Sequence, residues 1–540
     1  MGIKFQFQPR RCAQAINQLF VLALYCSLPA VTVATAAAPK GELFVARELY
    51  KKGEYFKAAR FAFAATGGDR RTRARAYSWV TLGLIKSGLH HSASYFFIRT
   101  LQTGSNADIR RVLTQTEELL FSVGPDLLRN FLIKHTQAQD YDSRNLSAFY
   151  YNLGKQVLLA GKPKRASSIL GEVQSSSALY PYALQLLGTA NALSGNDQVA
   201  LSYFRQCQKE SDVALGNLDS PGKYHTERWI HQKKEEAKDL NSRCIAGEAR
   251  TLYQMGQFKE SDIAYDKLSK NSFVWTDILF EQGWAAFAQR NYNRTLGRLV
   301  SYKSPSLKFV YNPEVEVLTA QAYMNLCLYK DTNEVINFFN RKYKNVGVRI
   351  KRYVERNRNG YRSFYEAGKR ALDDRLHTRN VFHRVLNRFV RSPYFQNLVE
   401  AEKDLTRERL AIRNFDRFHS GVSHRQGEGF PGFLNLVLNW RRKTIRLLGG
   451  VFVKNSLLDY HEKLIADFEM MSFIKLEMIS RAKEKLAFNR TPVAERFRGN
   501  IEPERRDYQY YWSFNGEFWN DEIGDYVFGL ESECSQASSS

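Results

Sequence analysis

The sequence predicts an all-α fold: a solenoid of stacked helical hairpins followed by a C-terminal helical domain. Three observations support this prediction. A turn residue recurs every 34 to 37 residues, small residues recur at fixed distances on either side of it, and apolar positions follow a helical period. The chain has 540 residues, of which 44 % are apolar and 25 % are charged, so it can bury a large core and is neither collagen-like nor wholly disordered.

The N-terminus has the pattern of a bacterial signal peptide. Lys4, Arg10 and Arg11 precede an apolar run over 19–33, and small residues follow it. We therefore expect cleavage directly after Ala36 or the alanine that follows it, which makes residues 1–36 a signal peptide and places the mature chain in the periplasm. The alternative is an uncleaved membrane anchor. The net charge of +24 indicates acidic partners, but an exported location argues against nucleic acid.

An internal repeat organises residues 37–345 into about eight hairpins. The recurring turn residues are Gly53, Gly88, Gly124, Gly161, Gly195, Gly256, Arg290 and Cys327. A glycine at the end of a helix provides the left-handed conformation that a tight turn needs, and small neighbouring residues let the two helices approach closely. The one long spacing, of 61 residues, indicates an insertion near 209–242 that extends the first helix of the sixth hairpin.

These hairpins resemble the tetratricopeptide repeat family. Residues 50–59, which read Tyr-Lys-Lys-Gly-Glu-Tyr-Phe-Lys-Ala-Ala, are the closest match, and the pairs Leu153-Gly154 and Leu187-Gly188 reproduce the Leu-Gly pair of the first helix. The resemblance implies a curved array in which the first helix of each hairpin lines a concave groove that binds a partner protein.

Basic side chains and tyrosines recur at the positions that this resemblance places in the groove. They are Arg47, Tyr50, Lys51, Arg75, Lys86, Tyr151, Lys155, Arg243, Arg250 and Tyr253. Such a set suits an acidic peptide segment or a terminal carboxylate. The alternative is that these lysines and arginines are merely solvated.

Residues 346–506 are expected to form a basic helical domain. Between 341 and 506 there are 37 basic and 19 acidic residues, and 16 of the basic residues lie within 341–392. This charge would also suit a peripheral contact with an anionic membrane surface, lipopolysaccharide or cell-wall polymer. We expect one helix over 433–448 and a longer one from about 455 to 487. On the longer helix, Leu457, Leu464, Met471 and Met478 form a seven-residue stripe that packs on neighbouring helices.

The tail, residues 507–540, has seven acidic residues and no basic one, and it is rich in aromatic residues. Disordered tails are poor in aromatics, so this one is expected to dock. We predict that residues 507–534 form a clasp on the basic C-terminal helices; the alternative is a partner-binding arm. The docking residues are expected to be Trp512, Phe514, Phe518 and Trp519. The stretch 512–522 resembles the ending of envelope repeat proteins associated with the gliding-motility machinery of myxobacteria.

Two cysteines flank the insertion. Cys207 and Cys244 lie on helices that face each other if the insertion loops out, so a disulfide between them is one expectation in an oxidising compartment. Two buried free thiols are the alternative.

Motifs of catalysis are weak. The sequence contains no His-Glu-x-x-His, no Gly-Lys-Ser/Thr phosphate loop and no Gly-x-Ser-x-Gly, and its paired histidines have poor spacing for a metal. We therefore expect no cofactor and no metal. The prediction is a non-catalytic periplasmic scaffold that binds another envelope protein, in a motility or envelope-assembly complex. A cell-wall or glycan-associated enzyme or regulator is the rival.

Overall fold

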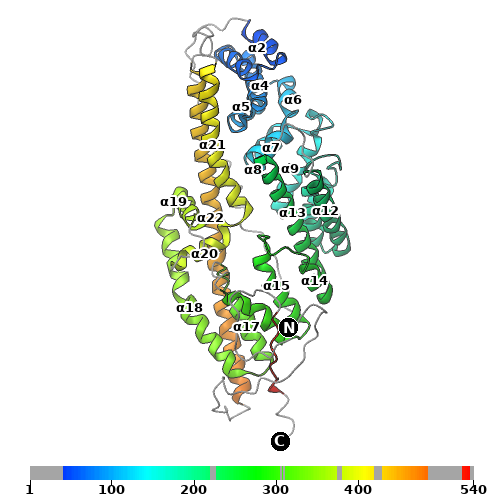
Figure 1. The fold of residues 1–540 in the computed structure, drawn as a ribbon, viewed down its shortest axis with the longest axis vertical. Helices are drawn as coiled ribbons and strands as arrows, with labels where there is room; N and C mark the ends of the chain where they lie inside the picture. The colour runs from blue at the N-terminus through cyan, green and yellow to red at the C-terminus, as the bar shows by residue number, and fades with distance from the viewer. Residues whose placement is uncertain are drawn as a thin grey trace. The chain divides into compact units, whose positions relative to one another are not determined.

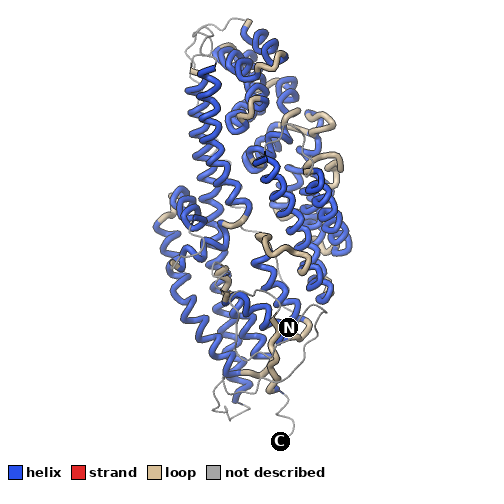
Figure 2. The backbone as a smooth tube through the Cα atoms, viewed as in Figure 1, coloured by secondary structure: helices blue, strands red, loops and turns tan. Residues whose placement is uncertain are grey.

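The structure is a computed structural model that describes residues 41–218, 227–304, 307, 310–373, 380–418, 429–483 and 526–534 (Figure 1). These residues form twenty-one α-helices and three short 3-10 helices, with no β-strand among them (Figure 2). The predicted all-α class is confirmed. The helices form two compact units, each of which combines repeat helices with part of the C-terminal region. Residue 345 is therefore not a boundary between compact bodies.

Unit 1 comprises the chain up to Cys207 together with residues 397–448. Its repeat helices are α2 (Glu42–Lys51), α3 (Tyr55–Ala64), α4 (Arg70–Lys86), α5 (His90–Thr103), α6 (Asn106–Leu113), α7 (Thr116–Val123), α8 (Pro125–His135), α9 (Leu146–Leu159), α10 (Pro163–Leu170), α11 (Tyr180–Leu193) and the first half of α12 (Asp197–Asn217). It also includes most of α21 (Pro393–Phe418) and the first part of α22 (Phe430–Lys483).

Unit 2 comprises residues 208–396 and 449–540. Its helices are the second half of α12, α13 (Glu227–Gln254), α14 (Phe258–Tyr265), α15 (Trp275–Ala288), α16 (Tyr292–Val300), α17 (Glu314–Asn325), α18 (Tyr329–Arg356), α19 (Tyr361–Asp373), α20 (Val381–Val390), the start of α21 and the remainder of α22. The length of α13 agrees with an insertion that extends the first helix of the sixth hairpin.

All eight turn residues have the positive φ that the repeat pattern requires, from 58° at Cys327 to 85° at Gly124. At Gly88, the glycine N–H donates to the Ile85 carbonyl and the next N–H donates to the Leu84 carbonyl, both at 2.9 Å. The same pair of bonds closes the turns at Arg290 and Cys327. These bonds satisfy carbonyls that a helix end otherwise leaves unpaired. The chain therefore reverses in the same way with or without glycine.

Glycines inside the helices allow close packing within the hairpins. A Cβ atom at Gly154 would lie 2.5 Å from Leu170 Cγ, and one at Gly188 would lie 2.7 Å from the Phe204 ring. Neither distance is tolerable for carbon atoms, so a larger side chain would push the hairpin apart. The small residues of the repeat therefore serve the packing that the sequence predicts for them.

In unit 1, aromatic side chains join the repeat helices to the C-terminal helices. Phe56 on α3 stacks on Phe415 of α21 with ring centroids 4.8 Å apart, and Phe63 lies 4.9 Å from Phe430 of α22. Buried rings of this size dominate the energetics of a core. The C-terminal helices are thus part of the same core as the hairpins.

A buried polar network accompanies this contact. Glu408 of α21 accepts hydrogen bonds from the backbone N–H groups of His91 and Ser92, at 2.6 and 3.0 Å, and from the Ser92 hydroxyl. Arg441 of α22 donates to the Val123 carbonyl at 2.7 Å. Glu408 therefore caps the N-terminus of α5, where backbone N–H groups would otherwise be unpaired.

The structure corrects the two helices expected over 433–448 and 455–487. A single helix, α22, runs through Gly449 and Gly450. A Cβ atom at Gly450 would lie 2.0 Å from the Tyr361 carbonyl oxygen, so this glycine permits the close approach of α19 and does not end the helix. The predicted stripe is buried: Leu457, Leu464, Met471 and Met478 are at most 6 % exposed.

Arg290 provides a test of the turn geometry. Its φ of 62° costs a non-glycine residue about 1–2 kcal/mol, whereas glycine adopts this conformation freely but loses about 0.5–1 kcal/mol through chain entropy. We expect Arg290→Gly to raise the free energy of unfolding by about 1 kcal/mol in urea titrations. Lys351→Gly, at an exposed position inside α18, is the control and should lower it by about 1 kcal/mol. A destabilised Arg290→Gly protein would contradict this account of the turn.

The pH dependence of the protein's stability tests the role of Glu408. Burial raises the pKa of its carboxyl to about 7, although the hydrogen bonds that it accepts act in the opposite direction. A raised folded-state pKa means that the folded state binds more protons than the unfolded state between about pH 4.5 and 7, so stability falls as pH rises through this window. We expect the stability of the wild type relative to Glu408→Gln to fall by about 3 kcal/mol between pH 5 and pH 8.

The comparison with Glu408→Gln is needed because His91 makes stability depend on pH in the opposite direction. Burial, together with the charge of Arg441, lowers the pKa of His91, so its contribution to stability is lost as the pH falls. That contribution is common to both proteins and cancels in the difference. A difference independent of pH would show that Glu408 is ionised throughout.

Candidate functional site

The basic residues that the sequence analysis assigns to a groove differ in their availability. In unit 1, Arg47 and Lys51 on α2 and Arg75 and Lys86 on α4 are exposed. Lys51 pairs with Glu48 at 2.8 Å, and Lys86 lies 3.5 Å from Glu118. Exposed pairs of this kind are weak and exchange readily with a ligand. These four cations remain candidates.

The aromatic residues assigned to the groove are less available. Tyr50 packs edge-to-face on Tyr55 and Trp79, with ring centroids 5.1 and 5.6 Å away. Tyr151 is only 7 % exposed and belongs to the core, so its assignment to a binding surface is wrong. Lys155 is half-buried, and its charge acts on Asp126. Burial alone would raise the pKa of Asp126, but the charges of Lys155 and Arg129 outweigh this effect and lower that pKa.

In unit 2, the assignment of Arg250 to the groove is also corrected. Its guanidinium makes two bonds to Glu281, of 2.9 and 2.7 Å, and Tyr265 donates to the same carboxylate. This arrangement holds α13 against α15 and leaves the guanidinium committed. Arg243 is exposed and pairs with Asp239 at 2.7 Å, while Tyr253 is half-buried against Phe258.

The C-terminal segment, residues 526–534, lies in an extended conformation on α16 and α17. Asn293 binds it in three ways: its carbonyl accepts from Phe528 N–H at 3.1 Å, and its side-chain amide both donates to and accepts from the backbone of Leu530 at 3.0 Å. Farther along, Glu533 N–H donates to the Leu326 carbonyl at 2.9 Å. The repeat helices therefore recognise the backbone of an extended chain.

Apolar side chains complete this contact. Phe528 and Leu530 are buried in one cluster with residues of α16, α17 and the turn that follows. The other buried members of the cluster are Leu296, Val300, Ala322, Leu326 and Leu328. Two buried side chains of this size stabilise the contact by about 1.5–3 kcal/mol each before ordering costs are subtracted.

A glycine on α16 determines the path of the C-terminal segment over this helix. A Cβ atom at Gly297 would lie 1.7 Å from the carbonyl oxygen of Tyr526, so only glycine allows the segment to pass this close to the helix. Gly297 was not predicted from the sequence, because a glycine within a helix has many explanations when its neighbours are unknown.

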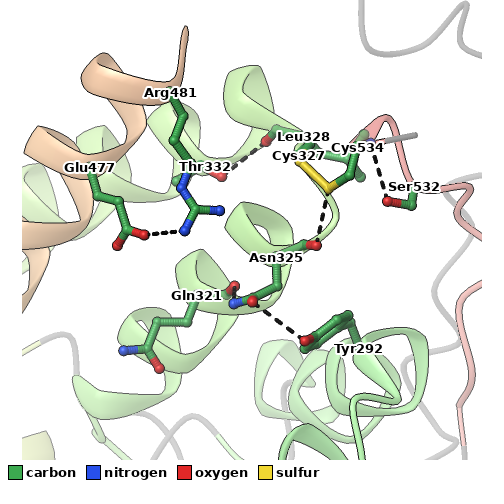
Figure 3. The surroundings of a disulfide bond; sticks show 10 residues. All are labelled: Tyr292, Gln321, Asn325, Cys327, Leu328, Thr332, Glu477, Arg481, Ser532 and Cys534. Atoms are coloured by element: carbon green, nitrogen blue, oxygen red, sulfur yellow. Dashed lines mark hydrogen bonds and ion pairs between the residues drawn. A yellow bond between two sulfur atoms is a disulfide. The ribbon is translucent and has the colours of Figure 1, made fainter. Parts of the chain in front are cut away.

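A disulfide fixes the end of the segment. Cys534 is bonded to Cys327, the turn residue of the last hairpin, with a Cα–Cα distance of 5.1 Å (Figure 3). The Cys534 sulfur also lies 3.4 Å from the Asn325 carbonyl oxygen. This bond was not predicted from the sequence, although disulfide pairing of cysteines in a chain expected to be exported was a signal that could have suggested it. Cys207 and Cys244 are likewise disulfide-bonded rather than free thiols, and their pairing with each other stays a prediction.

Of the predicted clasp, residues 507–534, the structure describes only the end, residues 526–534. Trp512, Phe514, Phe518 and Trp519 lie outside the described residues. The part of the tail that the structure describes docks on α16, α17 and the turn that follows α17. Burial of Phe528 and Leu530 and the Asn293 hydrogen bonds hold this part of the tail.

Beside the C-terminal segment lies a groove of about 800 Å³. Helices α16, α17 and α18 and the chain around Tyr311 form its walls, and Phe528 contributes to one of them. On α18 most of the lining residues follow helical spacing and form one face, among them Asp331, Glu334, Val335, Phe338, Arg341 and Lys342. This face is acidic near the start of the helix, aromatic in the middle and basic beyond.

One cation of the groove is already neutralised. Lys342 donates to Glu316 at 2.6 Å, and its ammonium lies 4.9 to 5.4 Å from the ring centroids of Tyr343, Phe338 and Tyr311. Burial raises the pKa of Glu316, an effect that the charge of Lys342 opposes. This ion pair is therefore part of the groove's wall.

The described part of the chain contains no group of three or more His, Cys, Asp or Glu side chains placed to hold a metal ion. Among the same residues, no helix combines the length and apolar character needed to cross a membrane. Searches with protein-family models and against curated proteins found no match to this chain.

Gly297 tests the contact with the C-terminal segment. Gly→Ala in a helix normally stabilises it by about 1 kcal/mol, but at Gly297 the added methyl group must displace Tyr526. We expect Gly297→Ala to speed hydrogen exchange at the Phe528 and Leu530 amides at least tenfold. The control is Gly216→Ala on α12, where nothing lies within 4 Å of the new methyl group. Unchanged exchange in Gly297→Ala would mean that the segment does not pass over this glycine.

Proposed function

We propose that this protein is a non-catalytic scaffold of the bacterial cell envelope, which binds an extended segment of another envelope protein on its repeat helices. The observation that carries the proposal is the docking of residues 526–534. Helices α16 and α17 bind that segment through Asn293 and through pockets for Phe528 and Leu530. Backbone bonds combined with alternate side-chain pockets are a general mode of peptide recognition.

A location outside the cytoplasm is supported by two observations. The N-terminal sequence has the pattern of a signal peptide. All four cysteines in the described residues are disulfide-bonded, which is compatible with an oxidising compartment. The resemblance of residues 512–522 to gliding-machinery proteins supports a partner in a motility or envelope-assembly complex.

The surface that we propose for the partner in unit 1 lies on the first helices of the first two hairpins. Arg47 and Lys51 on α2 and Arg75 and Lys86 on α4 expose their charges there, on the same helices as the Tyr50–Trp79 pair. Cations that flank an aromatic pair suit an acidic segment with apolar side chains. Lys155, Tyr151 and Arg250 are left out because packing or ion pairing engages them.

The test is capture of envelope proteins by the purified, oxidised mature chain, read by chemical cross-linking and mass spectrometry. The variant Arg47→Glu/Lys51→Glu/Arg75→Glu should reduce the cross-linked partner at least tenfold, because three charges on the proposed surface are reversed. These side chains are exposed, so the fold should be retained.

The control reverses three exposed cations elsewhere, in Lys344→Glu/Lys351→Glu/Arg352→Glu on α18. This control variant should leave the amount of cross-linked partner unchanged. Equal loss in both variants would point to nonspecific attraction by the net charge, and no loss in the first variant would contradict the proposed surface.

A further inference from the structure

We infer that the groove between α16, α17 and α18 is a second peptide site, and that it binds an extended acidic segment with one aromatic or large aliphatic side chain. The inference rests on the proposed function, because it assumes that the protein binds another protein. It concerns different residues from the first-helix surface of unit 1, so each can fail alone.

Two cations that line the groove, Lys303 and the exposed Arg341, make no hydrogen bond or ion pair with the described residues. Burial lowers the pKa of the Lys303 amine, although the charge of Glu316 acts in the opposite direction. A ligand carboxylate would supply the missing partner.

An exposed aromatic side chain lies beside these cations. Phe338 is 47 % exposed and lines the groove one helical turn before Arg341. Tyr323 and Phe528 contribute further apolar surface to the walls. Burial of a ligand's aromatic or aliphatic side chain against Phe338 would remove this surface from water.

The groove also offers a backbone contact of the kind that already holds the C-terminal segment. Asn337 is exposed and lines the groove next to Phe338, and a side-chain amide can bind a peptide backbone in two directions, as Asn293 does with Leu530. An extended ligand could therefore be bound through its backbone, its apolar side chain and its carboxylate together.

The distribution of charge along the groove determines where the acidic groups of the ligand lie relative to its apolar side chain. Asp331 and Glu334 line the groove where α18 begins, whereas Arg341 lies about two turns later. Acidic groups of a ligand are attracted to the second region and repelled by the first. The groove therefore selects a segment whose negative charge lies on one side of its apolar side chain.

The experiment uses the oxidised mature chain and fluorescent peptides in anisotropy titrations at fixed salt. The first peptide is Ser-Gly-Ser-Phe-Asp-Glu-Ser; in a second, Ala replaces Phe, and in a third, Asn and Gln replace the acids. We expect the first to bind at least tenfold more tightly than either of the others. Equal affinities for the Phe and Ala peptides would show that only electrostatic attraction holds the peptide, and would overturn the inference.

Variants locate the site. Lys303→Gln/Arg341→Gln and Phe338→Ser should each weaken binding of the first peptide at least tenfold, whereas Lys344→Gln/Lys351→Gln on the same helix should not. Peptide binding that is unaffected by the groove variants would overturn the inference. Loss of cross-linked partner in the unit 1 variant, with no peptide binding in the groove, would refute this site and leave the proposed function standing.

Discussion

The repeated turn is the constraint on which the rest of the structure depends. Each hairpin reverses at one residue with positive φ, and two backbone hydrogen bonds close most of these turns. Because this geometry needs a backbone conformation and not a particular side chain, Arg290 and Cys327 can replace glycine at a modest cost. At Cys327 the replacement has a further consequence: the turn of the last hairpin carries the thiol that binds Cys534.

Glycines in this protein have two different structural roles. At the turns they adopt positive φ with open space around them, as at Gly53 and Gly88, whereas inside helices they permit close approach. Gly297 admits the backbone of the C-terminal segment and Gly450 admits the backbone of α19. A helical glycine can therefore mark a place where another chain segment crosses the helix, and in α16 that crossing lies beside the groove.

Pairing, rather than net charge, distinguishes the cations that can bind a partner. The chain has an excess of 24 basic residues, yet Arg250, Lys342 and Arg441 are committed to internal bonds. A committed cation contributes to packing and would cost stability if a ligand removed its partner. On α2 and α4, Lys51 and Lys86 make only exposed ion pairs, which cost little to break. Lys303 and Arg341 pair with none of the described residues, and these exposed or unpaired cations are therefore the ones assigned to binding.

The sequence by itself determined the all-α class, the eight turn residues, the extended first helix of the sixth hairpin and the buried stripe of α22. These features are local or periodic, so each is encoded in a short stretch of chain. Only the tertiary structure decided that α22 continues through Gly449 and Gly450, that Tyr151 is buried, and that residues 526–534 dock on α16 and α17. Each of these depends on which distant residues come into contact: Tyr361 beside Gly450, Asn293 beside Leu530, and Cys327 beside Cys534.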